Sequence, residues 1–187
     1  MAFFFAALAV PQTWAAPDAV AGKAKAQLCA ACHGENGVSS MPDTPHLAAQ
    51  PALSIFYQLL QFRDQRRKGG GMEAIATTLT EQDMRDIAAH YATLPAPAPQ
   101  TGGDAQKIAR GQQIAQQQYC SSCHGAQLQG QKHVPRLSGQ SHTYFVTQLR
   151  NLRSGARADM DGTMASAARS LTDEEIDAMA AYARSLP

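Results

Sequence analysis

Two stretches, Cys29-Ala30-Ala31-Cys32-His33 and Cys120-Ser121-Ser122-Cys123-His124, repeat one five-residue pattern and contain all four cysteines of the 187-residue chain. In a helical turn the two thiols of such a stretch lie on one side, where they can add across the two vinyl groups of a porphyrin edge. The histidine after the second thiol then projects under the iron as its proximal ligand. The pattern is typical of covalent haem c attachment. It predicts two haem c groups, bound through Cys29, Cys32, Cys120 and Cys123 and ligated by His33 and His124.

Two alternatives, a zinc site and a redox-active disulfide, explain the pattern less well. Zinc ribbons usually separate their cysteine pairs by about 15–20 residues, whereas 87 residues lie between Cys32 and Cys120. A redox disulfide needs no histidine directly after its second cysteine, and here a histidine follows both times. We therefore favour covalent haem.

The composition fits small domains that contain a large apolar cofactor. A chain of this length forms one medium domain or two small ones. The net charge of +1 gives no indication of nucleic acid or of a strongly acidic surface as a partner. The aromatic content of 6% is low for building two small cores, and a porphyrin in each would supply the missing apolar volume.

Residues 1–15 have the features of a signal peptide, apart from the absence of a Lys or Arg before the apolar run. The run Phe3–Val10 is apolar, and Thr13 and Ala15 are small residues where a signal peptidase requires them. The run is much shorter than the roughly 20 residues of a membrane-spanning helix. We expect cleavage after Ala15 and a periplasmic protein, since c-type haem is attached on the outer side of the bacterial membrane.

The chain is an internal duplication. When the two cysteine stretches are superposed, further residues match at separations of 90 to 92 positions. We expect one domain over residues 16–95 and a second over residues 107–187. Between them, residues 96–106 begin proline-rich and continue with glycines, as in an extended linker. The matched pairs include Pro45/Pro135, Gln50/Gln140, Gln58/Gln148, Arg63/Arg153, Met72/Met164 and Leu94/Leu186.

The periodicity of each half is helical, with no convincing strand alternation, so the fold class is all-α. We expect a first helix that runs into the haem stretch, a middle helix and a final helix. Thr172 and Glu175 form a capping box at the start of the final helix, and Thr80 and Asp83 form a weaker one. The expected ranges of the first two helices are 19–31 and 54–65 in the first half and 105–122 and 143–153 in the second.

Met72 and Met164 are the predicted distal ligands of the two irons. Each lies seven residues before the Leu-Thr pair that opens the final helix, and each follows a glycine-containing stretch. A methionine presented from a flexible loop could reach the far face of a porphyrin. Since both halves offer one at the matching place, we expect His/Met ligation of both haems.

Other methionines and histidines are weaker candidates. Met84 and Met179 fall within the final helices, where core packing is the simpler interpretation. Met41 and Met160 have no matched methionine, although Met160 lies close enough to Met164 to remain a rival. His/His ligation is the main alternative, but no spare histidine has a histidine at the matched position: His46, His90, His133 and His142.

Two further sets of residues fit the surroundings of a haem. Pro45 and Pro135 follow their histidines closely, and their carbonyls are candidates to accept the second ring N–H; the alternative is an ordinary loop proline. Most of the arginines in the middle of each half are interpreted as solvated surface. One of two matched pairs, Arg63/Arg153 or Arg67/Arg157, is expected to neutralise haem propionates.

With Cys-x-x-Cys-His, Pro-x-Leu, Gln-x7-Gln-Leu, a late methionine and a capped terminal helix all doubled, the chain resembles the dihaem cytochromes c4. The resemblance covers everything after the expected signal peptide. It implies two tandem class I cytochrome c domains, related by a pseudo-twofold axis, with haems that face each other across the interface. It also implies electron transfer from a quinol-oxidising, cytochrome bc1-type donor to a terminal oxidase. The chain departs from a strict repeat at Ala49, matched by Gly139, and at Gln65, matched by Gly155.

The residues themselves favour an electron carrier over an enzyme. We therefore predict no catalytic residues. Two protein ligands on each iron leave no position for a substrate, and no nucleophile–base pair or phosphate loop stands out. Methionine ligation raises the potential, which suits a late respiratory carrier. One alternative is the dihaem cytochrome subunit of a periplasmic dehydrogenase or flavocytochrome. Another is an enzyme acting on thiosulfate or peroxide, which would need a displaceable ligand. Peripheral membrane association and the oligomeric state stay open.

Overall fold

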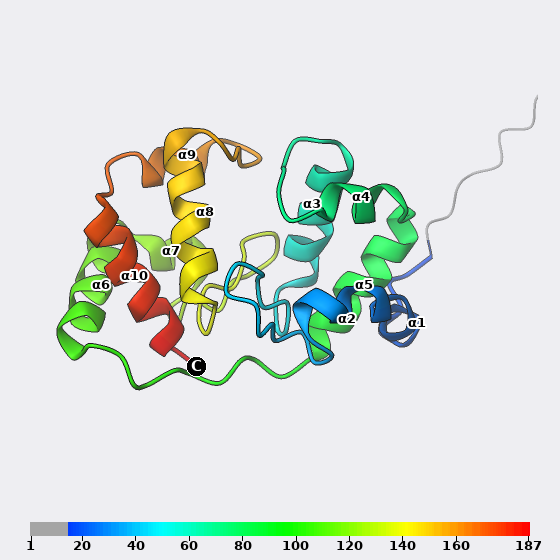
Figure 1. Cartoon of the computed structure of the whole chain (residues 1–187), viewed down its shortest axis with the longest axis horizontal. Coiled ribbons are helices and arrows are strands. Elements are labelled where there is room, and N and C mark those ends of the chain that lie inside the picture. The colour runs from blue at the N-terminus through cyan, green and yellow to red at the C-terminus, as the bar shows by residue number, and fades with distance from the viewer. Residues whose placement is uncertain (1–14) are drawn as a thin grey trace, which may run out of the picture.

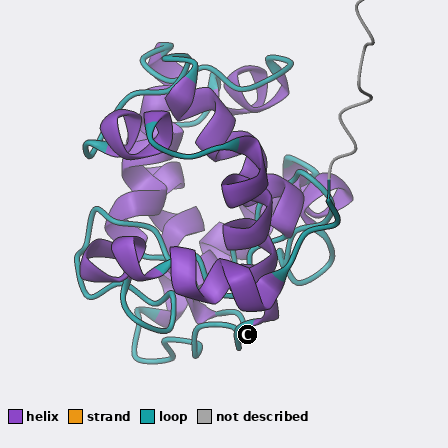
Figure 2. Cartoon of the chain, turned by 90° about the vertical axis from the view of Figure 1, so that its right-hand side faces the viewer, coloured by secondary structure: helices purple, strands orange, loops and turns teal. Residues whose placement is uncertain are grey.

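The structure, a computed structural model, describes residues 15–187 and contains helices and no strands over that range. The expected signal peptide, residues 1–15, lies outside the described residues apart from Ala15. No helix between residues 15 and 187 combines the length and apolar character needed to cross a membrane. The prediction of an all-α protein is confirmed (Figure 2).

The two halves of the chain lie side by side, and each is built from five of the described helices (Figure 1). The first half contains α1 (Ala19–Lys25), α2 (Gln27–His33), α3 (Ala52–Arg63), α4 (Met72–Thr77) and α5 (Glu81–Thr93). The second half contains α6 (Ala105–Gln117), α7 (Cys120–His124), α8 (His142–Ser154), α9 (Thr163–Ala168) and α10 (Asp173–Ser185).

An extended stretch joins the halves along one side of the molecule (Figure 1). It begins after Leu94, and the Gln100 N–H within it donates to the Arg184 carbonyl at 2.9 Å. The Asp104 side chain accepts the backbone N–H groups of residues 106 and 107, so α6 begins at Ala105. Residues 105 and 106 of the expected linker are therefore helical.

The structure corrects the first helix of each half, which is broken in two. In the first half Ala26 ends α1 and precedes α2, so the expected helix over 19–31 is not continuous. In the second half Tyr119 takes a left-handed conformation, with φ 53°, and this ends the expected helix over 105–122. Such a conformation cannot continue a right-handed helix. Each haem stretch therefore lies in a short helix that is separate from the helix before it.

The capping boxes at the start of the final helices are confirmed in both halves. The Thr80 side chain accepts the Asp83 N–H while the Asp83 side chain accepts the Thr80 N–H, and Thr172 and Glu175 make the same exchange. These bonds satisfy N–H groups that have no partner within the helix. The start of α5 and of α10 is thus fixed by local sequence.

Each half has its own apolar core. In the first half one face of α3, formed by Ile55, Leu59 and Phe62, is buried. Met84 and Met179 are buried in the cores of the first and second half, which confirms their interpretation as packing residues.

The two departures from a strict repeat do not change the backbone. Ala49 has φ 56° where Gly139 has 70°, and Gln65 has φ 58° where Gly155 has 79°. The left-handed region costs a non-glycine residue about 1–2 kcal/mol. The first half therefore keeps the shape of the second at some cost in stability.

A glycine lies where the first and last helices of each half cross. A Cβ on Gly22 of α1 would lie 1.9 Å from the Asp86 carbonyl oxygen of α5, and one on Gly111 of α6 would lie 2.1 Å from the Ala178 oxygen of α10. The obstacle is backbone in both cases, so it cannot move aside as a flexible side chain could. The two helix pairs pack this closely because neither glycine carries a side chain.

Replacing Gly111 with Ala should destabilise the second half by about 1–3 kcal/mol, as overpacking does. Thermal unfolding of the full chain should show a Tm lower by several degrees. Gly102→Ala is the matched control, because its Cβ would meet no atom within 4 Å. An equal Tm for the two variants would contradict the close crossing.

Candidate haem sites

The four thiols are unpaired and are placed alike in the two halves. Cys29 and Cys120 are half-buried and pack against the core of their own half, whereas Cys32 and Cys123 are exposed. Burial raises the pKa of the Cys29 and Cys120 thiols. Each pair thus extends from the edge of a core to the surface, as two bonds to a partly exposed porphyrin edge require.

The histidine of each haem stretch is buried and hydrogen-bonded to the expected proline carbonyl. His33 Nδ1 lies 3.0 Å from the Pro45 oxygen, and His124 Nδ1 lies 2.8 Å from the Pro135 oxygen. A carbonyl only accepts, so Nδ1 carries the proton and Nε2 keeps its lone pair. Burial lowers the pKa of both histidines, which favours the neutral ring that binds a metal. The prediction for Pro45 and Pro135 is confirmed.

The other ring nitrogen of His124 fits a metal ligand. Its Nε2 is buried and has no hydrogen-bond partner among residues 15–187. A buried polar atom normally has a partner, and an iron bound to this lone pair would be that partner. The histidine therefore has the tautomer, orientation and free lone pair that a proximal ligand needs.

Met72 and Met164 lie at the cores of their halves, whereas the rival methionines, Met41 and Met160, are exposed. Both are partly buried, and each packs against the core of its own half. Each stands at the start of a short helix, α4 or α9, behind a glycine in the left-handed conformation. The expected loop is therefore a helix N-terminus. Met41 and Met160 are 47% and 59% exposed.

The spare histidines have other surroundings. His46 Nδ1 accepts the Ser39 N–H at 3.0 Å, and His142 Nε2 lies 3.0 Å from an Asp177 oxygen. His133 makes an edge-on contact with the ring of Tyr57, and His90 packs against the ring of Tyr91.

Asp159 holds the backbone around Met164, a role that the sequence analysis missed. One carboxylate oxygen accepts the Met164 N–H at 2.6 Å, and the other accepts the Ala165 N–H at 3.4 Å. In the first half the Met72 N–H reaches only the Gly69 carbonyl, at 3.3 Å. An acid just before a helix start is the signal that indicates such a cap.

Of the two matched arginine pairs, one is half-buried and bound to acids of its own half. Arg63 forms ion pairs with Asp64 at 3.0 Å and with Glu81 at 3.5 Å. Arg153 contacts Asp173 at 2.5 Å and donates to the Leu171 carbonyl at 2.7 Å. Protein groups already neutralise this pair.

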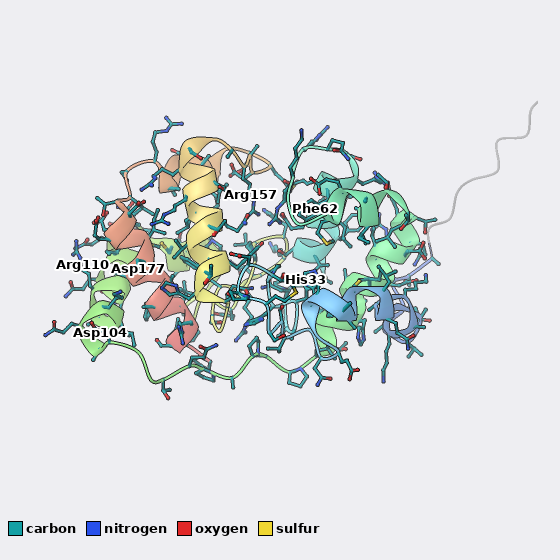
Figure 3. All side chains as sticks on the ribbon, viewed as in Figure 1. His33, Phe62, Asp104, Arg110, Arg157 and Asp177 are labelled. Atoms are coloured by element: carbon teal, nitrogen blue, oxygen red, sulfur yellow. The ribbon has the colours of Figure 1, made fainter. Side chains whose placement is uncertain are left out.

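The other pair, Arg67 and Arg157, lies between the halves. Arg67 donates to the Tyr144 hydroxyl at 2.7 Å and to Gln148 at 3.2 Å, and also contacts Gln58. Arg157 donates to Gln148 at 2.9 Å and to Gln58 at 3.1 Å. Figure 3 shows Arg157 on the side of the second half that faces the first.

These two guanidinium groups form no ion pair with any carboxylate of residues 15–187. Burial, followed by the charge of Arg67, lowers the pKa of Arg157 to about 10. Burial alone would raise the pKa of Tyr144, but the two cations lower it overall. A buried cation, Arg67, and a half-buried one, Arg157, share neutral acceptors, which suits an anionic group such as a propionate.

Two family models match the chain, one on each half. The model described as Cytochrome c matches residues 108–187, and the model described as Cytochrome C oxidase, cbb3-type, subunit III matches residues 15–90.

Characterised relatives match over nearly the whole length. Cytochrome c4 of Pseudomonas aeruginosa is 35% identical, over 92% of this chain and 90% of the relative. Cytochrome c4 of Thiocapsa roseopersicina is 40% identical, over 90% and 93%. A thiosulfate dehydrogenase electron acceptor of Thiomonas intermedia is 32% identical, over 93% and 86%.

A solved structure has the same arrangement of both halves. The crystal structure of reduced recombinant cytochrome c4 from Pseudomonas stutzeri superposes with a TM-score of 0.85 at 28% identity. The match covers 92% of this chain and 100% of that one. The expectation of two tandem cytochrome c domains is confirmed.

Replacing Asp159 with Ala should speed hydrogen exchange of the Met164 and Ala165 amides by roughly ten- to a hundredfold. A hydrogen bond to a charged group contributes about 1.5–3 kcal/mol, and each 1.4 kcal/mol is tenfold. Asp161→Ala is the control, because Asp161 accepts the Thr163 N–H, at 3.0 Å, whereas the Met164 and Ala165 N–H groups donate to Asp159. Equal exchange rates in both variants would show that Asp159 does not hold this segment.

Proposed function

The chain belongs to the dihaem cytochrome c4 family and is an electron carrier with two haem c groups, and we propose that it works in the periplasm. There it takes electrons from a quinol-oxidising complex of the cytochrome bc1 type and delivers them to a terminal oxidase. A near-neutral net charge of +1 suits a carrier whose contacts depend only mildly on salt.

In this proposal Cys29 and Cys32 attach one haem, and Cys120 and Cys123 attach the other. His33 and His124 are the proximal ligands of the two irons. The observation that carries the proposal is the pair of Nδ1–H bonds to Pro45 and Pro135, which leave Nε2 of each ring to bind. The haem iron, when bound, supplies a centre that gains and loses one electron.

Met72 and Met164 are the proposed distal ligands. Both pack against their own core, which places a thioether, an uncharged and soft donor, in an apolar setting. A thioether raises the potential relative to a second histidine. Filling the sixth position also excludes water and small substrates, which suits transfer without catalysis.

Arg67 and Arg157 are the residues that we assign to the propionates. Their shared neutral acceptors, Gln58 and Gln148, orient both guanidinium groups without cancelling their charge. Arg63 and Arg153 are already paired with acids. Cations between the halves would favour the reduced, less positive form of a haem more than carboxylates would. Propionates bound there would offset part of this positive charge.

A second candidate function is that of a dedicated electron acceptor for a periplasmic dehydrogenase. The relative from Thiomonas intermedia, named as an acceptor of thiosulfate dehydrogenase, matches over 93% of this chain. In this role the protein would use the same two haems, but it would exchange electrons with one dehydrogenase, bound permanently or specifically, in place of the respiratory complexes.

The Met164→His variant should have one haem of lower potential and one that is unchanged. The far-red sulfur-to-iron absorption of the oxidised protein should also fall to about half, because one of two proposed Met–iron bonds is lost. Spectroelectrochemistry measures both. Met160→Leu is the control, since Met160 is 59% exposed; loss of the band in that variant instead would reject the assignment of Met164.

The isolated, reduced protein should bind carbon monoxide slowly or not at all at neutral pH, because both irons have six ligands in the proposal. It should reduce an added oxidase and be reduced by a bc1-type complex in stopped-flow mixing. Rapid carbon monoxide binding would contradict the ligand set. Stable co-purification with a dehydrogenase, and no reaction with the respiratory complexes, would select the second candidate.

A further inference from the structure

We propose that Gln50 and Gln140 each tune the haem held by the opposite half of the molecule. The inference rests on the proposed role of His33 and His124 as proximal ligands. It concerns how the two halves are connected, and not whether haem is bound.

The first connection runs from Gln140 of the second half to His33 of the first. Gln140 Oε1 accepts the His46 N–H at 2.8 Å, and Gln140 Nε2 donates to the His46 carbonyl at 3.0 Å. The His46 N–H and the Pro45 carbonyl belong to one peptide group. That carbonyl accepts the His33 Nδ1–H at 3.0 Å. One rigid amide therefore joins the glutamine of one half to the histidine of the other.

The second connection is the same in the reverse direction. Gln50 Oε1 accepts the Arg136 N–H at 2.9 Å, and Gln50 Nε2 donates to the Arg136 carbonyl at 2.8 Å. The Pro135 carbonyl of that same peptide group accepts the His124 Nδ1–H at 2.8 Å. Both glutamine side chains are buried, with 7% and 5% exposure for Gln50 and Gln140. Water therefore has little access to these bonds.

A hydrogen bond at the N–H of an amide shifts electron density toward its carbonyl oxygen. Bonds in such a chain strengthen one another by about 10–30% each. A stronger acceptor at the proline carbonyl makes the histidine ring more basic. A more basic ligand favours the oxidised iron, so each glutamine lowers the potential of the haem across the interface.

A purely adhesive role for the glutamines makes a different prediction. The halves are also joined by Arg67 and Tyr144 and by Ser141, whose hydroxyl donates to the Pro42 carbonyl at 2.5 Å. Loosening the interface would shift the potentials of both haems together, or would change the solvent exposure of either haem. Only transmission through the peptide groups gives a crossed pattern.

The test uses the full-length holoprotein with Gln140→Leu and Gln50→Leu, which remove the amide and keep a similar volume. Potentials of the individual haems follow from NMR-monitored redox titration of haem methyl signals, assigned with Met164→His. Gln140→Leu should raise the potential of the first-half haem alone, and Gln50→Leu that of the second-half haem alone. The nitrogen shift of the His33 Nδ1–H should change in Gln140→Leu, and that of His124 in Gln50→Leu.

Ser141→Ala is the control, because it removes the hydroxyl bond to the Pro42 carbonyl, and the α8 cap, but keeps the Ser141 N–H that donates to Gln140 Oε1. The two bonds between Gln140 and His46 therefore stay in place. A shift in the haem of the variant's own half, equal shifts in both haems, no shift, or the same shift in Ser141→Ala would overturn the inference. If a leucine variant yields no holoprotein, the corresponding asparagine variant withdraws the amide by one methylene and should give the same crossed pattern. A wild-type protein without two haems ligated by His33 and His124 would refute the proposed sites instead.

Discussion

The bond between a buried histidine Nδ1–H and a proline carbonyl is the interaction on which each half depends. It fixes the ring in one tautomer and one orientation, so that Nε2 is presented as a donor. It also ties the short helix of the haem stretch to the loop that forms the contact between the halves. Cofactor binding, local fold and domain contact therefore meet at one peptide group in each half, that after Pro45 for His33 and that after Pro135 for His124.

The sequence was sufficient where the determinants are local or repeated. The capping residues Thr80 and Thr172 carry their own hydrogen-bond partners three residues ahead, and the proline carbonyls lie close to their histidines along the chain. Duplication selected Met72 and Met164 over Met160, and the burial of the two methionines agrees with that choice. The ligand roles themselves remain predictions.

The rest could not be predicted because it depends on tertiary contacts. A left-handed Tyr119 has no signal in a helical pattern, because tyrosine does not favour that conformation. Gly22 and Gly111 are weak helix formers, and they are needed only because a second helix crosses each of them closely. The sequence of one helix does not indicate that crossing. Gln50 and Gln140 were recognised as a matched pair, but their partners lie in the opposite half, and no spacing within one half indicates that.

The reciprocal contacts of Gln50 and Gln140 have the form of an isologous interface, in which residue i of one unit meets residue j of the other and the reverse. Two separate domains with this surface would associate only as far as their concentration allowed. The extended stretch between Leu94 and Ala105 makes the encounter intramolecular, and a short linker corresponds to an effective concentration in the millimolar range. The two redox centres therefore stay paired at any dilution, and the pair diffuses as one particle.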